Sequence, residues 1–181
     1  RIALSYTAKT YSGTISAFGG SGAGSGSQRG GAGTVWQKIS TATDGDVLID
    51  NNGVSGNTTN QVAAATWTIA NLTINKVTYL IPSGATTTVT TSITSPVAGS
   101  TLTNNGSLNL PATTTLTNLT FTQNGTISNA SSVSLTLGSG TTMEVQNTDP
   151  TTALSLSNLT IQSGGTLRHL GNASPKMLNL S

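Results

Sequence analysis

The chain has no cysteine and few charged or aromatic residues, and each shortage excludes a class of protein. Without cysteine, neither a disulfide scaffold nor a zinc site built on thiolates can form. Charged residues make up 7% of the 181 residues, against about 25% in an ordinary soluble domain. The formal net charge is +2, so we do not expect a basic patch that binds nucleic acid by neutralising its phosphates.

Long hydrophobic runs are also missing. No apolar stretch reaches the roughly 18 residues that a membrane-spanning helix needs, so we expect no membrane span. No stretch of the chain places apolar residues at helical spacing either. We therefore expect little helix of any kind.

What the chain contains instead is threonine, serine, glycine and asparagine. It has 35 threonines, 23 serines, 21 glycines and 16 asparagines, which together make up just over half of the residues. Short runs in which apolar and polar residues alternate, bounded by glycine, are typical of half-buried strands. We expect strands of this kind at Ile2–Tyr6, Thr14–Phe18, Thr34–Gln37, Asp46–Ile49, Thr66–Ile74 and Ser134–Leu137. The pattern predicts an all-β protein.

Three Asn-Gly pairs lie between or beside these runs. They begin at Asn52, Asn105 and Asn124. Asparagine and glycine are turn residues that tolerate a positive φ, so each pair predicts a turn.

A short motif recurs along the chain. NLTFTQNGTI starts at Asn118 and NLTIQSGGTL starts at Asn158, and related copies start at Asn71, Ser107 and Ser134. Each copy has an apolar–polar–apolar triplet, a short turn and a second apolar segment. Repeats of about 20 residues or more are typical of solenoids, in which each coil buries its apolar face on its neighbours. Two such coils fit into the interval between Asn118 and Asn158.

These patterns predict a right-handed parallel β-helix that forms a single solenoid domain over residues 1–181. Residues 1–43 form a module of strands and a glycine-rich loop, and residues 44–181 form threonine-rich coils. The glycine-rich run Gly19–Gly33 is expected to leave the surface between two coils. The alternative fold is a tandem of antiparallel Ig-like β-sandwiches, which would repeat at about 100 residues. The side chains predicted to point inward are Leu72, Ile74, Leu108, Leu110, Leu119, Phe121, Leu135, Leu137, Leu159 and Ile161.

The N-terminal third resembles a module that recurs in very large exported bacterial proteins. The stretches that carry the resemblance are RIALSY, SGTISAFGGSG, GGAGTVWQK and LIDNNG, which lie between Arg1 and Gly53. Those proteins are β-solenoid repeat proteins of the adhesin or surface-structure type. The resemblance implies an extracellular, cell-surface location and a structural or adhesive role, and it supplies no catalytic residues.

Three of the five acidic residues lie close together in the sequence, at Asp44, Asp46 and Asp50. Calcium in proteins takes six to eight oxygen ligands, so this segment is a candidate calcium site, the one cofactor that the sequence suggests. The other interpretation is a solvated turn beside a strand, in which the carboxylates accept backbone N–H bonds. An EF-hand is not indicated, because no glutamate follows at the twelfth loop position.

The chain offers little for acid–base catalysis, so we expect that it is not an enzyme. Glycosidase chemistry needs two carboxylates that face one cleft. Aromatic residues are 4% of the chain and scattered, so the sequence indicates no aromatic-lined groove. His169 lies beside Arg168 and is expected in a surface turn, and no Gly-x-Ser-x-Gly nucleophile elbow is present.

Between Asn51 and Met143 the only charged residue is Lys76, although soluble surfaces usually carry both signs of charge. Strand-like segments also stand at both ends of the sequence, RIALSY and MLNLS, and an unpaired strand edge favours pairing with another chain. We therefore expect a structural or adhesive extracellular protein that is a subunit or segment of a surface filament, sheath or stalk. Its partners would be other copies, end to end or laterally, or the rest of a longer chain.

Two alternative functions remain open. The first is a glycan-binding module, which clustered exposed aromatic residues would favour. The second is an ice-binding solenoid, which a flat, repeated array of threonines would favour. The Thr-x-Thr runs that suggest such an array are Thr86–Thr90, Thr113–Thr117 and Thr120–Thr122.

Overall fold

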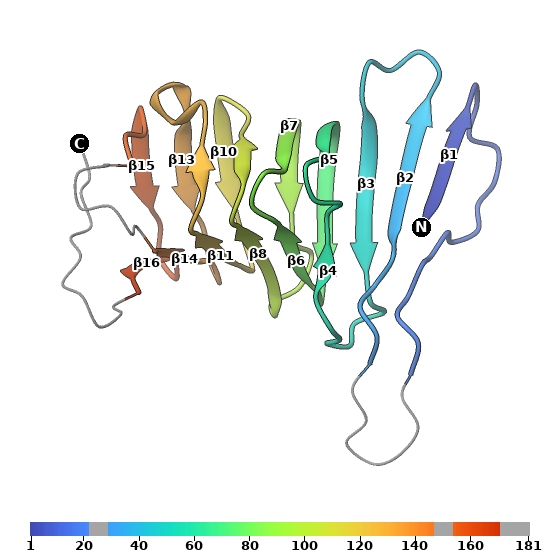
Figure 1. The fold of residues 1–181 in the computed structure, drawn as a ribbon, viewed down its shortest axis with the longest axis horizontal. Coiled ribbons are helices and arrows are strands. Elements are labelled where there is room, and N and C mark those ends of the chain that lie inside the picture. The colour runs from blue at the N-terminus through green and yellow to red at the C-terminus, as the bar shows by residue number, and fades with distance from the viewer. Residues whose placement is uncertain (22–28, 147–153, 171–181) are drawn as a thin grey trace.

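The computed structural model describes residues 1–21, 29–146 and 154–170, and in it the chain forms a β-solenoid of about five turns (Figure 1). The seven-stranded sheet has the spatial order β1 (Ile2–Tyr6), β2 (Thr34–Ile39), β3 (Gly45–Asp50), β5 (Thr66–Asn75), β7 (Thr86–Thr94), β9 (Ser107–Asn109) and β12 (Thr126–Ile127). The six-stranded sheet has the order β16 (Thr166–His169), β14 (Thr142–Val145), β11 (Leu119–Gln123), β8 (Ser100–Asn104), β6 (Thr78–Ile81) and β4 (Thr59–Asn60). The three-stranded sheet consists of β10 (Thr113–Leu116), β13 (Ser134–Leu137) and β15 (Asn158–Ile161).

Helix is almost absent from these ranges. A single turn of 3₁₀ helix, η1 (Ala130–Ser132), precedes β13. Within the described ranges, no helix is long and apolar enough to cross a membrane.

Neighbouring strands run parallel in all three sheets, with one exception. β2 and β3 form an antiparallel pair in which Trp36 lies opposite Val47, so β1 and β2 run opposite to the rest of their sheet (Figure 1). The parallel β-helix predicted from the sequence is confirmed, and the alternative of antiparallel sandwiches is wrong. The boundary expected between residues 43 and 44 falls in the turn that joins β2 to β3.

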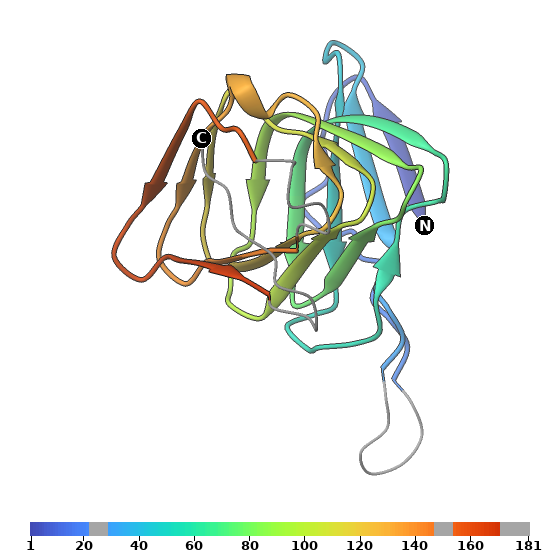
Figure 2. The same cartoon turned by 60° about the vertical axis from the view of Figure 1, so that its left-hand side comes forward.

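Figure 2 shows the solenoid as a stack of coils around one interior. Inside it, equivalent side chains of consecutive coils stack in columns. Tyr79, Leu102, Phe121 and Met143 form one column across β6, β8, β11 and β14, and each is at most 1% exposed. Because side chains alternate along a strand, the residues before and after each of these four point to the outside of the solenoid. The interior is therefore a continuous apolar core that every coil extends.

Eight of the ten side chains predicted to point inward are at most 3% exposed. The two that differ are Leu159, which is half-buried, and Ile161, which is 49% exposed. Both belong to β15, the last strand of its sheet among the described residues, so no further described coil covers them. Ile161 is in register with the buried Leu137 and so lies on the predicted inner face, but it is not buried there. The strand expected from MLNLS lies outside the described residues.

The recurring motif forms a corner between two sheets. The copies that start at Ser134 and Asn158 stack directly on each other, since β13 pairs with β15 and β14 with β16. The more similar copy at Asn118 begins in the six-stranded sheet, where its first strand, β11, pairs with β14, the second strand of the Ser134 copy, so these two copies stack out of step. The coils differ in the number of residues that they contain. Fewer residues separate the stacked pair Thr101 and Thr120 than the stacked pair Val47 and Leu72.

The glycine-rich stretch follows β1 and precedes β2 in the chain, and it forms two legs that project away from these strands (Figure 1). The legs are joined by a backbone bond in which Gly30 N donates to Gly20 O at 2.9 Å. They lie so close that a Cβ on Gly19 would be 2.0 Å from the carbonyl oxygen of Gly30, which only glycine avoids. The strand predicted at Thr14–Phe18 is wrong, because this part of the first leg makes isolated contacts in place of a ladder. Residues 22–28 lie outside the described ranges.

Candidate functional site

A groove of about 320 Å³ opens at the N-terminal end of the solenoid. The seven-stranded sheet extends past β3 to β2 and β1, whereas the six-stranded sheet ends at β4. The groove lies at this extension of the seven-stranded sheet. Its walls are Trp36, Trp67, Val47, Ile69 and Ala3, with Arg1 at one side. Pockets that bind small molecules are mostly apolar and about 300–1,000 Å³ in volume, so the groove falls at the lower end of that range.

Trp36 owes its position to the antiparallel pairing of β2 and β3. It lies opposite Val47, and its indole ring covers Gly45 at the start of β3. A Cβ at Gly45 would be 2.5 Å from Nε1 of the indole, so the ring rests directly on the backbone of β3. An aromatic ring that covers a glycine on a neighbouring strand is a recognised way to stabilise a sheet. Any side chain at position 45 would displace the ring.

Trp67 lies on a part of β5 that projects beyond β3. β3 begins at Gly45, opposite Ile69, so β5 has no strand neighbour on that side at Trp67. The guanidinium carbon of Arg1 is 5.2 Å from the centroid of the Trp67 ring, a distance typical of a cation–π contact. Among the described residues that line the groove, Arg1 alone is charged.

A buried polar network supports the end of β5 on which Trp67 lies. Gln61 is 2% exposed, and its Nε2 donates to the carbonyl oxygens of Ala65 (3.0 Å) and Thr86 (3.1 Å), which precede β5 and begin β7. Its Oε1 accepts hydrogen bonds from Thr87 Oγ1 and from the Tyr79 hydroxyl at 3.3 Å. Burial raises the pKa of the Tyr79 phenol well above its ordinary value, which keeps the hydroxyl protonated as a donor.

The sequence indicated no aromatic-lined groove, but the structure contains one. Trp36 and Trp67 lie far apart in the sequence, and both line the same groove. Neither lies in a cluster of aromatic residues, so composition carries no sign of their proximity. The relevant signal is the reversal between β2 and β3, which alternation alone does not distinguish from a parallel step.

The candidate calcium ligands do not converge. The carboxylates of Asp46, Asp50 and Asp44 accept hydrogen bonds from three different side chains, which are Asn71 Nδ2 (2.7 Å), Asn75 Nδ2 (3.0 Å) and Thr90 Oγ1 (3.2 Å) respectively. Four residues along a strand span about 13 Å, too far for Asp46 and Asp50 to ligate one ion. The described part of the chain holds no group of three His, Cys, Asp or Glu side chains able to bind a metal. Calcium binding at these residues stays a prediction that no contact in the structure supports.

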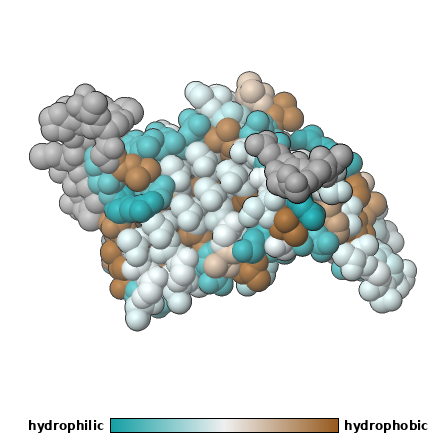
Figure 3. Space-filling model, turned by 90° about the horizontal axis from the view of Figure 1, so that it is seen from below, coloured by the Kyte–Doolittle hydropathy of each residue, from teal (hydrophilic) through white to brown (hydrophobic). Residues whose placement is uncertain are grey.

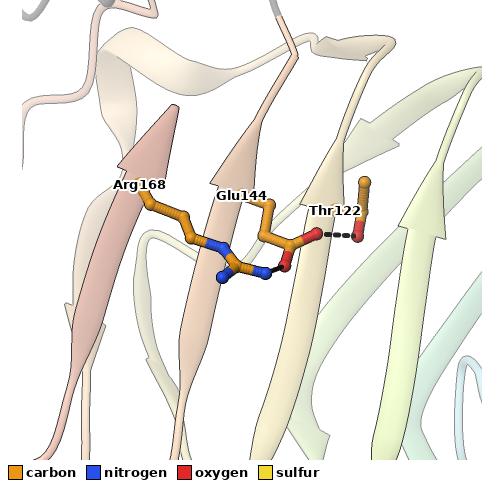
Figure 4. Close-up of polar contacts among 3 residues, drawn as sticks. All are labelled: Thr122, Glu144 and Arg168. Carbon is orange, nitrogen blue, oxygen red and sulfur yellow. Dashed lines mark hydrogen bonds and ion pairs between the residues drawn. The ribbon is translucent and has the colours of Figure 1, made fainter. Parts of the chain in front are cut away.

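Glu144 is the centre of a polar row on the outer side of the six-stranded sheet (Figure 4). Thr122 Oγ1 donates to its Oε2 at 3.1 Å, and Arg168 Nη2 donates to its Oε1 in an ion pair. The side chain of Glu144 is 11% exposed, so the guanidinium compensates a carboxylate that would otherwise be buried alone. We interpret the row as structural. His169, expected in a surface turn, is half-buried in β16.

The outer face of the seven-stranded sheet carries ladders of uncharged side chains that bond from coil to coil. Ser92 Oγ donates to Asn71 Oδ1 at 2.7 Å, and the hydroxyls of Thr73 and Thr94 are 3.0 Å apart. On the underside of the molecule the space-filling view is mostly pale, which denotes near-neutral hydropathy, with small separate brown and teal areas (Figure 3). The flanks thus present hydroxyl and amide groups with little charge.

The chain matches no protein-family model, no curated protein and no solved structure. The solenoid fold therefore rests on the strand pairing itself.

Proposed function

We propose that the chain is a non-catalytic structural and adhesive β-solenoid of an extracellular surface, and a subunit or segment of a filament, sheath or stalk. The flanks between Asn51 and Met143, where Lys76 is the only charged residue, support this role, because they permit close lateral packing with little charge repulsion or desolvation of buried ions. The resemblance of the N-terminal third to exported bacterial surface proteins agrees with it.

The observation that carries the proposal is the free edge of β1. Tyr6 O accepts a hydrogen bond from Ser40 N at 2.7 Å, so the backbone of Tyr6 faces β2. Because the bonding direction alternates along a strand, the N–H groups of Ala3 and Ser5 face away from β2. Both residues are exposed, and within the described ranges neither N–H has a hydrogen-bond partner. An edge strand of this kind, with no proline and no charge in IALSY, accepts another strand.

Proline at the free edge tests this proposal. Ser5→Pro removes one outward donor and leaves the bonds to β2 in place, since proline is tolerated where an edge N–H faces solvent. The matched control Ser5→Ala keeps the donor. We expect negative-stain images and sedimentation velocity to show filaments or sheets for the wild type and for Ser5→Ala, and isolated particles for Ser5→Pro. Isolated particles in the wild type, or unchanged assemblies in Ser5→Pro, would overturn end-to-end assembly.

The two alternatives differ in their support. The three threonine runs belong to three different sheets, through β7, β10 and β11, so they do not make one flat array, and ice binding gains nothing from the structure. Glycan binding is favoured by a specific observation, the two tryptophans of the N-terminal groove. Adhesion to a glycan is compatible with the structural role.

A further inference from the structure

We propose that the groove between Trp36 and Trp67 binds one acidic sugar ring, a uronic acid residue of a polysaccharide. The inference deepens the adhesive part of the proposed function and rests on it. It is carried by three features of the groove: its aromatic walls, its unpaired backbone groups and its single cation.

The aromatic walls fit a pyranose ring. One face of such a ring presents C–H groups, which pack on the flat face of an indole, while the ring hydroxyls remain at the rim. The groove supplies two indoles and the aliphatic side chains of Val47 and Ile69 in about 320 Å³. This volume suits a single ring-sized group better than an extended chain lying along the sheet.

The backbone of β5 offers hydrogen-bonding groups beside the rings. Thr86 N donates to Ala65 O, so alternate residues of β5 from Ala65 onwards face β7, and Thr66 faces the opposite side. β3 begins only opposite Ile69, and Thr66 therefore has no strand partner there. Its N–H and C=O are free to bond the hydroxyls of a ligand in the groove, which Thr66 lines.

The charge of the groove selects an acid. Arg1 lies over Trp67, and the described lining includes no carboxylate that would neutralise it. A guanidinium binds a carboxylate through two parallel N–H bonds, and its flat face can stay on the indole at the same time. A uronic acid combines the apolar ring face that the tryptophans accept with the carboxylate that Arg1 accepts. A neutral sugar satisfies only the first.

The walls are held in place before any ligand binds. Trp36 rests on Gly45, and the Gln61 network fixes the start of β5 just before Trp67. Rigid side chains lose little conformational entropy on binding, so a small groove of this kind can bind a single ring usefully.

The experiment titrates oligogalacturonate, oligomannuronate and oligoglucuronate into the full chain and follows tryptophan fluorescence. Neutral galacto-, manno- and gluco-oligosaccharides of equal length serve as comparison. The protein used is Ser5→Pro, so that self-association through β1 and saccharide binding succeed or fail separately. We expect at least one uronate to bind saturably and its neutral counterpart to bind about tenfold or more weakly.

Variants locate the site. Trp67→Ala and Arg1→Gln are each expected to weaken uronate binding about tenfold or more, and Arg1→Gln also removes the preference for the acid. Lys9→Gln is the matched control, because Lys9 makes a comparable cation–π contact with Tyr11, 4.9 Å from the ring centroid, outside the groove. It should leave binding unchanged.

Several results would overturn the inference. These are no response to any uronate, equal binding of neutral sugars, or binding that survives both Trp67→Ala and Arg1→Gln. Arg1→Gln alters an exposed side chain and should leave the thermal midpoint unchanged, so loss of binding in this variant is not a folding effect. If the wild type self-associates and Trp67→Ala abolishes that association, the groove holds a second copy and not a sugar.

Discussion

Replacing Phe121 with alanine tests the claim that stacked columns hold the solenoid together. Phe121 is fully buried, in register with Leu102 in the coil before it and Met143 in the coil after it. Removing a phenylalanine side chain from a filled core costs about 3–5 kcal/mol, from lost burial and from the cavity that remains. Domains are stable by only about 5–15 kcal/mol, so the loss is a large fraction of the total.

The expected shift in unfolding temperature follows from the chain length. For a domain of about 150–250 residues, 1 kcal/mol corresponds to about 2–4 °C, so Phe121→Ala should lower the thermal midpoint by about 6–20 °C. The control is Thr120→Ala, the preceding residue on the outer side of β11, where the expected change is within about 0.5 kcal/mol. Thermal unfolding followed by circular dichroism measures both. If the two variants shift the midpoint equally, Phe121 does not occupy a stacked core column.

Two further predictions concern buried positions. Leu119→Asp places a carboxylate at a site that is 2% exposed and should unfold the stack. Leu159→Asp, at a half-buried site, should lower the urea midpoint of unfolding far less. Equal decreases of the urea midpoint in the two variants would contradict this ranking. The raised pKa of Tyr79 means that the unfolded chain releases the phenolic proton first, so the wild type should lose stability as the pH rises above about 10. Tyr79→Phe should remove part of that loss, and parallel urea midpoints against pH in the two proteins would refute the assignment.

The residues that face the interior were predictable from the sequence because the face of a strand on which a residue lies depends on alternation alone. Leu135 and Leu137 stand in the pattern apolar–polar–apolar, and any strand that buries one face places both inside. The same reasoning places Ile161 on the inner face but does not predict its exposure, because burial also needs a neighbouring coil. Sequence alternation describes which face a residue occupies, and the end of the described stack decides whether that face is covered.

Which residues of neighbouring coils stack on each other was harder to predict from the sequence. The interval between the two most similar copies, at Asn118 and Asn158, suggested two whole coils, whereas the first copy begins in the six-stranded sheet and the second in the three-stranded sheet. The motif encodes a strand, a turn and a second strand, and any corner of the solenoid accepts that sequence. Because the coils differ in length, similar corners then fall at different places around the solenoid.

The Asn-Gly pairs show how one sequence signal serves two physical needs. Asn52 and Gly53 have φ values of 55° and 69°, as the turn prediction requires. Gly106 and Gly125 also lie in bends between strands, as predicted, but they do not adopt positive φ. A Cβ on Gly106 would lie 2.4 Å from Ala85 O, and one on Gly125 would lie 2.1 Å from Gly106 O, so close stacking of corners requires these glycines.

The groove was out of reach of sequence analysis because it results from an interruption of the repeat. In the coil after Trp67, the residue in register is Thr87, which is fully buried and bonded to Gln61. A threonine suffices there because the coil is closed around it. An indole at the same position of the preceding coil needs more room, and the room exists because β2 reverses and leaves the inner face of the sheet open beside β3. The place where the solenoid departs from its own pattern is therefore the place where large aromatic side chains can meet a ligand.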